Sequence, residues 1–444
     1  MNIKLSDHFT YKKLMRFTLP SIAMMIFTSI YGIVDGYFVS NFVGKTPFAA
    51  VNLVWPLIMM LATVGFIFGT GGTAIVAKTM GEGDREKANH HFSLFVYVTF
   101  ALSVVLSVCG FIFMRPIASL LGAEGELLEC AVVYARIILA TLPFYALQLL
   151  FQSFFVTAEK PQLGLIVTIS SGVTNMVFDA LFVLLLPTHL KLVGAAWATS
   201  LSQVVGGAVP IVYFACKNKS LLRLGKTRFD GHAVLKATTN GSSEFMSNVS
   251  MSLVGMLYNI QLMKYAGENG VAAYGVMMYV SMIFSGTFIG YSIGTAPVIG
   301  FHFGAQNKKE LKSLLRKSLI LMLVFGIIMA GASQLLAWPL AQIFVGYDDA
   351  LSTLTTEGFR IFGLSFAFMG FAIFFSGFFT ALSDGLTSAA ISFLRTLVFQ
   401  ISAVMLLPLI FGINGVWISI VVAEAMAMTF GLIFTKLKQK RFGY

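Results

Sequence analysis

Long apolar runs separated by short polar segments set the pattern of this chain. Each run can form a helix of roughly 20 residues, the length that spans a bilayer's ~30 Å hydrocarbon core. We therefore predict an all-α integral membrane protein with twelve transmembrane helices. Their approximate bounds are 14–42, 47–77, 92–114, 131–157, 164–187, 193–216, 238–265, 271–301, 314–338, 357–382, 388–411 and 415–435.

The second half of the chain repeats the pattern of the first. The segment GGTAIVAKTMGEGDREK from Gly71 aligns with GTAPVIGFHFGAQNKKE from Gly294. The segment from Tyr134 aligns with that from Gly358, and LLPTHLKLVG aligns with LLPLIFGING. The offset between aligned segments hardly changes along the chain. A steady period of half the chain indicates duplication.

Duplication predicts how the spans are grouped. Each half has an even number of spans, so we expect two six-helix bundles related by a pseudo-twofold axis along the membrane normal. We place the first bundle at residues 1–216 and the second, with its tail, at 238–444. Residues 217–237 form a basic linker that we expect to be cytoplasmic.

The distribution of charge supports a membrane location. Charged residues make up 11% of the chain, against about 25% in a soluble domain. The net charge of +11 does not indicate nucleic acid, because Lys and Arg lie in short loops and not on one amphipathic face. If the N-terminus is cytoplasmic, most Lys and Arg residues fall on the cytoplasmic side of the membrane. The positive-inside rule therefore places both termini in the cytoplasm.

The first bundle carries acids at membrane depth. Asp35 lies in GIVDGYFVS, inside the first apolar run. A charge there costs on the order of 3 kcal/mol, so it normally faces a protein interior or a water-filled cavity and has a function. The fifth run carries Asn175 and Asp179, four residues apart on one helix face, and the sixth offers Thr199.

We predict that these four side chains converge as a cation site. Two nearby carboxylates in a low dielectric cannot both ionise cheaply, so the pair can hold a proton, and oxygen ligands also suit Na⁺. We predict no other metal. Taken singly, Asn175 and Thr199 are also explained by hydrogen bonds between helices.

The second bundle does not repeat this site. Tyr258 stands where the repeat predicts the counterpart of Asp35, and Ala403 lies near the position expected for Asp179. Other candidates of second rank remain there. Glu424 lies in the last span and Arg395 in the eleventh, and the sequence leaves open whether they pair. The third candidate is Glu244, near the inner end of the seventh span, where it is either functional or a solvated helix-terminal charge.

Several segments, by their order and spacing, resemble the multidrug and toxic compound extrusion (MATE) family, and most of all its DinF-like and MepA-like branches. These segments are LPSIAMMIFTSIYGIVDGYFVSNFVG, AAVNL, GTGGTAIVAKTMGEGD and NMVFD. The resemblance covers essentially the whole chain. It implies a secondary antiporter of the bacterial cytoplasmic membrane that exports organic, often cationic, compounds and other amphiphilic drugs. The exchange would be for H⁺ or Na⁺, by alternating access.

The resemblance also assigns residues. Pro20 matches a first-helix proline associated in the family with bending of that helix, and Glu244 resembles a seventh-span acid that some branches use. The first-lobe cation site of the family is matched by Asp35, Asn175, Asp179 and Thr199. We expect a monomer in contact with membrane lipid, with no cofactor beyond the coupling ion.

Other function classes receive less support. The sequence contains no Walker loop, HExxH motif or nucleophile elbow, so we do not expect an enzyme. A flippase for a lipid-linked saccharide, of the same wider superfamily, is the nearest alternative, although such proteins tend to have a more cationic cavity. A channel is less consistent with duplicated bundles and sparse intramembrane acids. The glycines Gly286, Gly290 and Gly294, like Gly65 and Gly69, are spaced by four and predict close helix packing.

Overall fold

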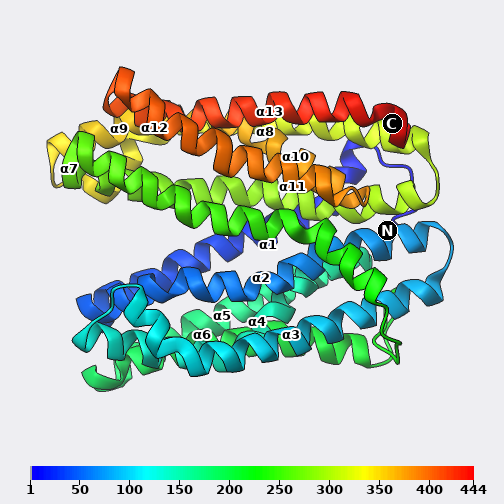
Figure 1. Cartoon of the computed structure of the whole chain (residues 1–444), viewed down its shortest axis with the longest axis horizontal. Coiled ribbons are helices and arrows are strands. Elements are labelled where there is room, and N and C mark those ends of the chain that lie inside the picture. The colour runs from blue at the N-terminus through cyan, green and yellow to red at the C-terminus, as the bar shows by residue number, and fades with distance from the viewer. Residues whose placement is uncertain (1–2) are drawn as a thin grey trace.

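The computed structural model describes residues 3–444, which are almost entirely helical. Two helical bundles lie side by side (Figure 1). We call the N-terminal one the N lobe. Its helices are α1 (Tyr11–Phe38), continued by the π-helical turn η1 (Val39–Val43), α2 (Lys45–Gly81), α3 (Arg85–Leu120), α4 (Gly125–Thr157), α5 (Pro161–Leu185), the short 3₁₀ turn η2 (Thr188–Leu190) and α6 (Lys191–Ala215).

The remaining helices form the second bundle, which we call the C lobe. They are α7 (Gly231–Gly304), α8 (Lys308–Val345), α9 (Asp349–Gly363), α10 (Phe366–Ala381), α11 (Gly385–Phe393), the π-helical turn η3 (Leu394–Phe399), α12 (Gln400–Phe411) and α13 (Ile413–Phe442). Both ends of the chain lie at the same end of the molecule, marked N and C in Figure 1.

The described residues contain the twelve expected spans. Ten helices are long and apolar enough to cross a membrane, and α9 with α10, bent by 46°, makes an eleventh. The helix α7 counts twice, because Gly267 interrupts it at φ 60° and ψ −150°. Only glycine adopts these angles readily. The all-α transmembrane prediction is confirmed.

Two helices that begin before their apolar runs, α3 and α8, are each capped by a polar side chain. Asp84 caps α3 by accepting a hydrogen bond of 2.9 Å from the Lys87 backbone N–H. Asn307 caps α8 in the same way, accepting a hydrogen bond of 3.1 Å from the Glu310 backbone N–H. Such caps satisfy amides that have no partner within the helix. The offset between Asp84 and Asn307 is the one that aligns Gly71 with Gly294, so the repeat extends to the caps.

The duplication is also visible in single backbone angles. Three non-glycine residues of the described chain have positive φ: Glu159 (59°), Gln306 (57°) and Ser383 (58°). Glu159 and Ser383 correspond in the repeat and follow equivalent helices, α4 and α10. Gln306 corresponds to Gly83, whose φ is 90°. The two lobes therefore share turns that ordinary side chains adopt only at some cost.

Small residues bring α1 against the second half of α7. A Cβ added to Gly290 would lie 2.6 Å from the Ile22 Cα, and one on Gly294 would lie 3.0 Å from the Thr18 side chain. In the N lobe, a Cβ on Gly69 would lie 3.2 Å from the Leu150 Cα of α4. The predicted glycine stripes are therefore helix contacts, as expected for membrane bundles.

The two lobes touch near the end that carries both termini. Gly71 of α2 packs on the Ala237 backbone at the start of α7, and Gly81 packs on the Phe301 backbone near its end. The segment before α1 lies here too: the Leu5 N–H donates to Glu159 Oε1 of the N lobe (2.7 Å). Four residues later, the Phe9 N–H donates to Glu310 Oε1 of the C lobe (2.9 Å). We call this end, where the two lobes are in direct contact, the closed end.

Candidate functional site

Three helices of the N lobe bring polar side chains together at membrane depth. Asp35 comes from α1, Asn175 from α5 and Thr199 from α6. The Asn175 Nδ2 and the Thr199 Oγ1 each lie 3.5 Å from Asp35 Oδ1. These distances are at the long limit of a hydrogen bond. Both contacts go to Oδ1, and neither involves the other carboxylate oxygen, Oδ2.

Asp179 lies one turn beyond Asn175 on α5. Its side chain is fully buried, and neither carboxylate oxygen has a hydrogen-bond partner among the described residues. A buried polar group without a partner is costly. No ion pair in the described part of the chain involves Asp179 or Asp35. Neither acid is therefore neutralised by a positively charged side chain of the described chain.

The approach of α1 to α5 depends on a glycine. A Cβ on Gly172 would lie 2.5 Å from the Phe27 ring and 2.9 Å from the Tyr31 ring, both on α1. Gly172 is nearly one turn before Asn175, so it allows α1 to lie close to the polar face of α5. The Thr199 hydroxyl also donates to the Ala195 backbone oxygen (3.2 Å). Its single proton is thus shared between the helix and the site.

A second polar layer, which the sequence pattern did not predict, lies beside the site. The buried Gln148 of α4 donates to Ser171 Oγ (3.2 Å), and Ser171 donates to the Ser202 backbone oxygen (2.7 Å). Nearby, Thr141 donates to Gln203 Oε1 (2.9 Å). The available signal was spacing: Ser171 lies four residues before Asn175, on the same helix face. These bonds tie α4, α5 and α6 together behind the acids.

Pro20 lies buried inside α1, fifteen residues before Asp35. The helix is assigned without interruption from Tyr11 to Phe38. A proline inside a helix removes one backbone hydrogen bond. The contact of Gly290 with Ser21 and Ile22 lies directly beside this position.

In the C lobe, Arg395 and Glu424 do touch. The Arg395 Nε lies 3.0 and 2.9 Å from the two Glu424 carboxylate oxygens, and its Nη2 lies 2.9 Å from Oε1. The Glu424 side chain is 0% exposed and that of Arg395 is 17% exposed. Gln400 adds a contact of 3.5 Å. This is a multiple, charge-assisted contact, the strongest class of protein hydrogen bond.

The rest of the C lobe departs from the N-lobe site, as the sequence indicated. Tyr258 is buried and stacks on Tyr274 with ring centroids 5.3 Å apart and planes within 1°. Ala403 is also buried. Neither residue offers a carboxylate. The paired-acid arrangement is therefore confined to the N lobe among the described residues.

Glu244 is not a helix-terminal charge, which corrects one of the two interpretations of this acid. The helix α7 begins at Gly231, so Glu244 lies about 20 Å along it. It is half-buried, and no hydrogen bond or ion pair of the described residues reaches its carboxylate. Gly241, one turn earlier, packs against Ile67 of α2. Glu244 thus lies close to the contact between the two lobes.

The chain matches known proteins over nearly its full length. The MatE family model matches residues 20–181 and again residues 245–406. A curated relative, the multidrug export protein MepA of Staphylococcus haemolyticus, is 26% identical over 417 residues, which are 94% of this chain and 91% of the relative. MepA of Staphylococcus aureus is 24% identical over 433 residues, covering 97% and 94% of the two chains.

Solved structures share the fold. A multidrug resistance MATE family transporter of the MOP superfamily, in its outward-facing conformation, superimposes with a TM-score of 0.91 at 22% identity. The match covers 98% of each chain. The two matched segments of the family model are of equal length, one in each lobe. The duplication seen in the backbone turns is therefore present in the family model as well.

Proposed function

Because the chain belongs to the MatE family of multidrug and toxic compound extrusion (MATE) transporters, we propose that it exports organic compounds across a membrane in exchange for H⁺ or Na⁺. The protein is a transporter and not an enzyme. Curated relatives over nearly the whole chain are named multidrug export proteins. Small organic cations and other amphiphilic drugs are the proposed substrates.

One observation supports the ion-coupling part of the proposal most strongly. Asp35 and Asp179 lie at membrane depth without an ion-pair partner among the described residues, and both oxygens of Asp179 are unpartnered. Acids in this setting bind a proton or a hard cation readily. Asn175 and Thr199 supply an amide and a hydroxyl beside Asp35. We assign these four residues to the coupling site.

We further propose how the site acts on α1. Ion entry at Asp35 and Asp179 removes their mutual repulsion and draws α1 toward α5. Pro20 gives α1 a position with one hydrogen bond fewer, where it can bend. Such bending would change the surface that α1 offers to a substrate between the lobes. The two lobes then rock between two arrangements, which is alternating access.

The orientation belongs to the same proposal. The positive-inside rule places both termini in the bacterial cytoplasm, and both lie at the closed end of the molecule (Figure 1). The structure would then correspond to a state that is closed toward the cytoplasm. We propose a monomer, because each copy contains both lobes and the whole N-lobe site.

The energetics permit export. Exchange of one proton for one monovalent cation is electroneutral, so a pH gradient supplies about 1.4 kcal/mol per pH unit. With more than one coupling ion, the membrane potential adds about 2.3 kcal/mol per net charge at 100 mV.

The test is transport of a fluorescent organic cation into inside-out vesicles. A pH gradient and a Na⁺ gradient are imposed separately on vesicles with the wild type, with Asp35→Asn, or with the control Asp349→Asn at an exposed helix start. We expect one gradient to drive uptake in the wild type and the control. In Asp35→Asn, uptake should fall to the level of vesicles without the protein, although the protein should fold.

Gradient-driven uptake that survives Asp35→Asn would refute the role of this acid. If neither gradient drives dye uptake into vesicles with the wild type, the drug-export proposal fails as a whole. A lipid-linked saccharide would then be the next substrate class to test.

A further inference from the structure

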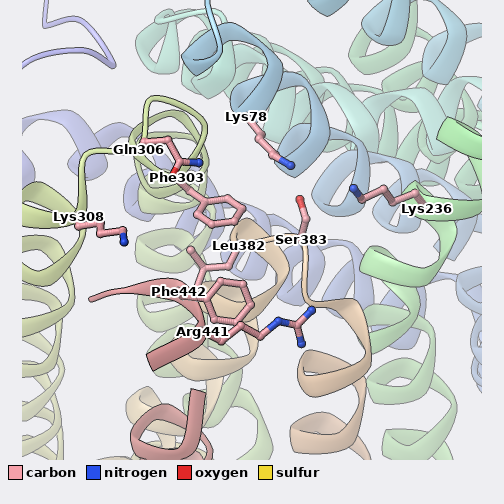
Figure 2. Close-up of a pocket in the computed structure, with 9 residues that line it drawn as sticks. All are labelled: Lys78, Lys236, Phe303, Gln306, Lys308, Leu382, Ser383, Arg441 and Phe442. Atoms are coloured by element: carbon pink, nitrogen blue, oxygen red, sulfur yellow. The ribbon is translucent and has the colours of Figure 1, made fainter. Parts of the chain in front are cut away.

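A basic cavity lies at the closed end of the molecule, separate from the N-lobe site. Its volume is about 390 Å³, within the range of small-molecule sites. Figure 2 shows four cationic side chains around it, together with a serine, a glutamine and two phenylalanines. The lining residues are Lys78, Lys236, Phe303, Gln306, Lys308, Leu382, Ser383, Arg441 and Phe442.

The four cations come from the ends of four helices. Lys78 lies in the last turn of α2, Lys236 near the start of α7, Lys308 at the start of α8 and Arg441 in the last turn of α13. The cavity thus lies where the N lobe meets the C lobe. The Gly304 contact with the Lys78 backbone fixes α2 against α7 at this point.

Nearby acids do not balance these charges. Glu82 lies 3.6 Å from the Lys78 ammonium. Asp384 lies 3.9 Å from Arg441 but closer, at 3.3 Å, to Lys438 outside the cavity lining. In the described part of the chain, Lys236 and Lys308 have no ion-pair partner. Like charges around a confined space repel one another, so an anion in the cavity would relieve that repulsion.

Ser383 provides a polar atom inside the cavity. Its hydroxyl is buried and has no hydrogen-bond partner among the described residues. In Figure 2 it points toward the side of the cavity where Lys78 and Lys236 lie. Its N-lobe counterpart, Glu159, is already occupied by the Leu5 backbone N–H at 2.7 Å. The equivalent turns therefore differ: the Glu159 carboxylate accepts a hydrogen bond from this chain, whereas the Ser383 hydroxyl has no partner among the described residues.

The backbone of the lining is also unusual. Ser383 and Gln306 are two of the three non-glycine residues with positive φ in the described chain, and both line this cavity. Such conformations are costly and are concentrated at functional sites. Cation–π contacts hold two of the cations in place: Lys78 over Phe303 at 5.4 Å and Arg441 over Phe442 at 5.2 Å.

We propose that this cavity binds a phosphate group and that the bound phosphate joins the two lobes at the closed end. Lys and Arg side chains at converging helix ends are the usual phosphate-binding groups, and the Ser383 hydroxyl adds a neutral donor. The phosphate is either a free anion or the head group of an anionic lipid. Phosphate binding in this cavity does not depend on which compound the protein exports.

The test measures thermal unfolding of the purified full-length protein. In one arm, inorganic phosphate is titrated in an uncharged detergent, with chloride at equal ionic strength as reference. In the other, the protein is placed in nanodiscs of phosphatidylcholine with or without phosphatidylglycerol, in phosphate-free buffer. We expect a saturable rise of the unfolding midpoint in at least one arm. The first arm identifies a free anion and the second a lipid head group.

Variants make the test specific. The double variant Lys236→Gln/Lys308→Gln should weaken the apparent affinity, measured as the ligand concentration at half of the midpoint shift, about a hundredfold, because each of the two charge-assisted contacts contributes about a factor of ten. The control Lys312→Gln/Lys440→Gln removes the same charge from exposed positions outside the cavity and should respond like the wild type. Equal responses of the two variants, or no response of the wild type in either arm, would overturn the proposal.

Discussion

In the N lobe, the half-buried Asp35 and the buried Asp179 have no positively charged partner among the described residues, whereas in the C lobe an arginine neutralises the buried Glu424. Asp179 is fully buried and unpartnered among the described residues. Glu424 is equally buried but receives three contacts of 2.9–3.0 Å from Arg395. The same duplicated scaffold thus carries two electrostatic designs. We propose that the first binds the coupling cation, whereas the second already contains a positively charged partner.

The difference shows what the duplication preserved. Helix caps and turns occur at corresponding positions of the two halves, including the positive φ angles of Glu159 and Ser383. The side chains on that scaffold diverged. We infer that backbone geometry was retained for packing, and we propose that ion binding is confined to the N lobe.

The largest expected effect on stability comes from breaking the C-lobe pair. Arg395→Met leaves Glu424 buried without its positive partner, which should lower the free energy of unfolding by about 3–5 kcal/mol. Thermal or denaturant unfolding in detergent measures this loss. The double variant Arg395→Met/Glu424→Gln should recover most of it, because no charge is left uncompensated. Equal stability of the single and double variants would show that the pair is not an electrostatic unit.

A smaller effect should distinguish the packing of the two lobes. In the N lobe, Gly65 of α2 packs against the Ala146 backbone oxygen of α4. At the equivalent C-lobe contact the sizes are reversed: Phe288 of α7 packs on Gly370 of α10, where a Cβ would lie 2.5 Å from the Phe288 ring. The repeat therefore kept the contact, with Phe288 in place of Gly65 and Gly370 in place of Ala146.

We predict that Gly65→Ala is the more damaging of two equal substitutions. Its Cβ meets a backbone oxygen that cannot rotate away, so we expect a cost of about 1–3 kcal/mol. Gly370→Ala meets a side chain that can shift, so its cost should be lower. Gly255→Ala, with open space around the added Cβ, is the control. Comparison of unfolding midpoints tests the order, and a reversed order would show that contact with the backbone oxygen is not the more costly of the two.

The smallest effect should come from the ion pair on the surface of the N lobe. Arg115 of α3 contacts Glu129 of α4, and their side chains are 54% and 57% exposed. Exposed pairs contribute about 0–1 kcal/mol, so Arg115→Gln should change stability by no more than that. The same unfolding assay compares it with Arg395→Met. A loss in Arg115→Gln as large as that in Arg395→Met would mean that burial is not what separates the two pairs.

Most of the fold was predictable because the bilayer dictates it. Each span must be long and apolar, so hydropathy located all twelve. The break between α9 and α10 near Ser365 and the π-helical turn around Arg395 were not predicted. Local backbone angles of this kind leave the hydrophobicity of a span unchanged.

The candidate sites were predictable only in part. Spacing placed Asn175 and Asp179 on one face, but the position of Asp35 beside them depends on how α1 docks at Gly172. The pairing of Arg395 with Glu424 depends on the rotation of two helices about their axes, which neither spacing nor composition specifies. The basic cavity was missed for the same reason, since its cations come from four separate helix ends.

We propose that the coupling ion binds in the N lobe and not in the C lobe. Direct binding of Na⁺ and uptake of protons by the purified protein test it, with Asp179→Asn compared against Arg395→Met/Glu424→Gln. We predict saturable binding of one of these ions to the wild type, loss of that binding in Asp179→Asn, and retention in the C-lobe double variant. Binding that survives Asp179→Asn but disappears with the C-lobe pair would contradict the account.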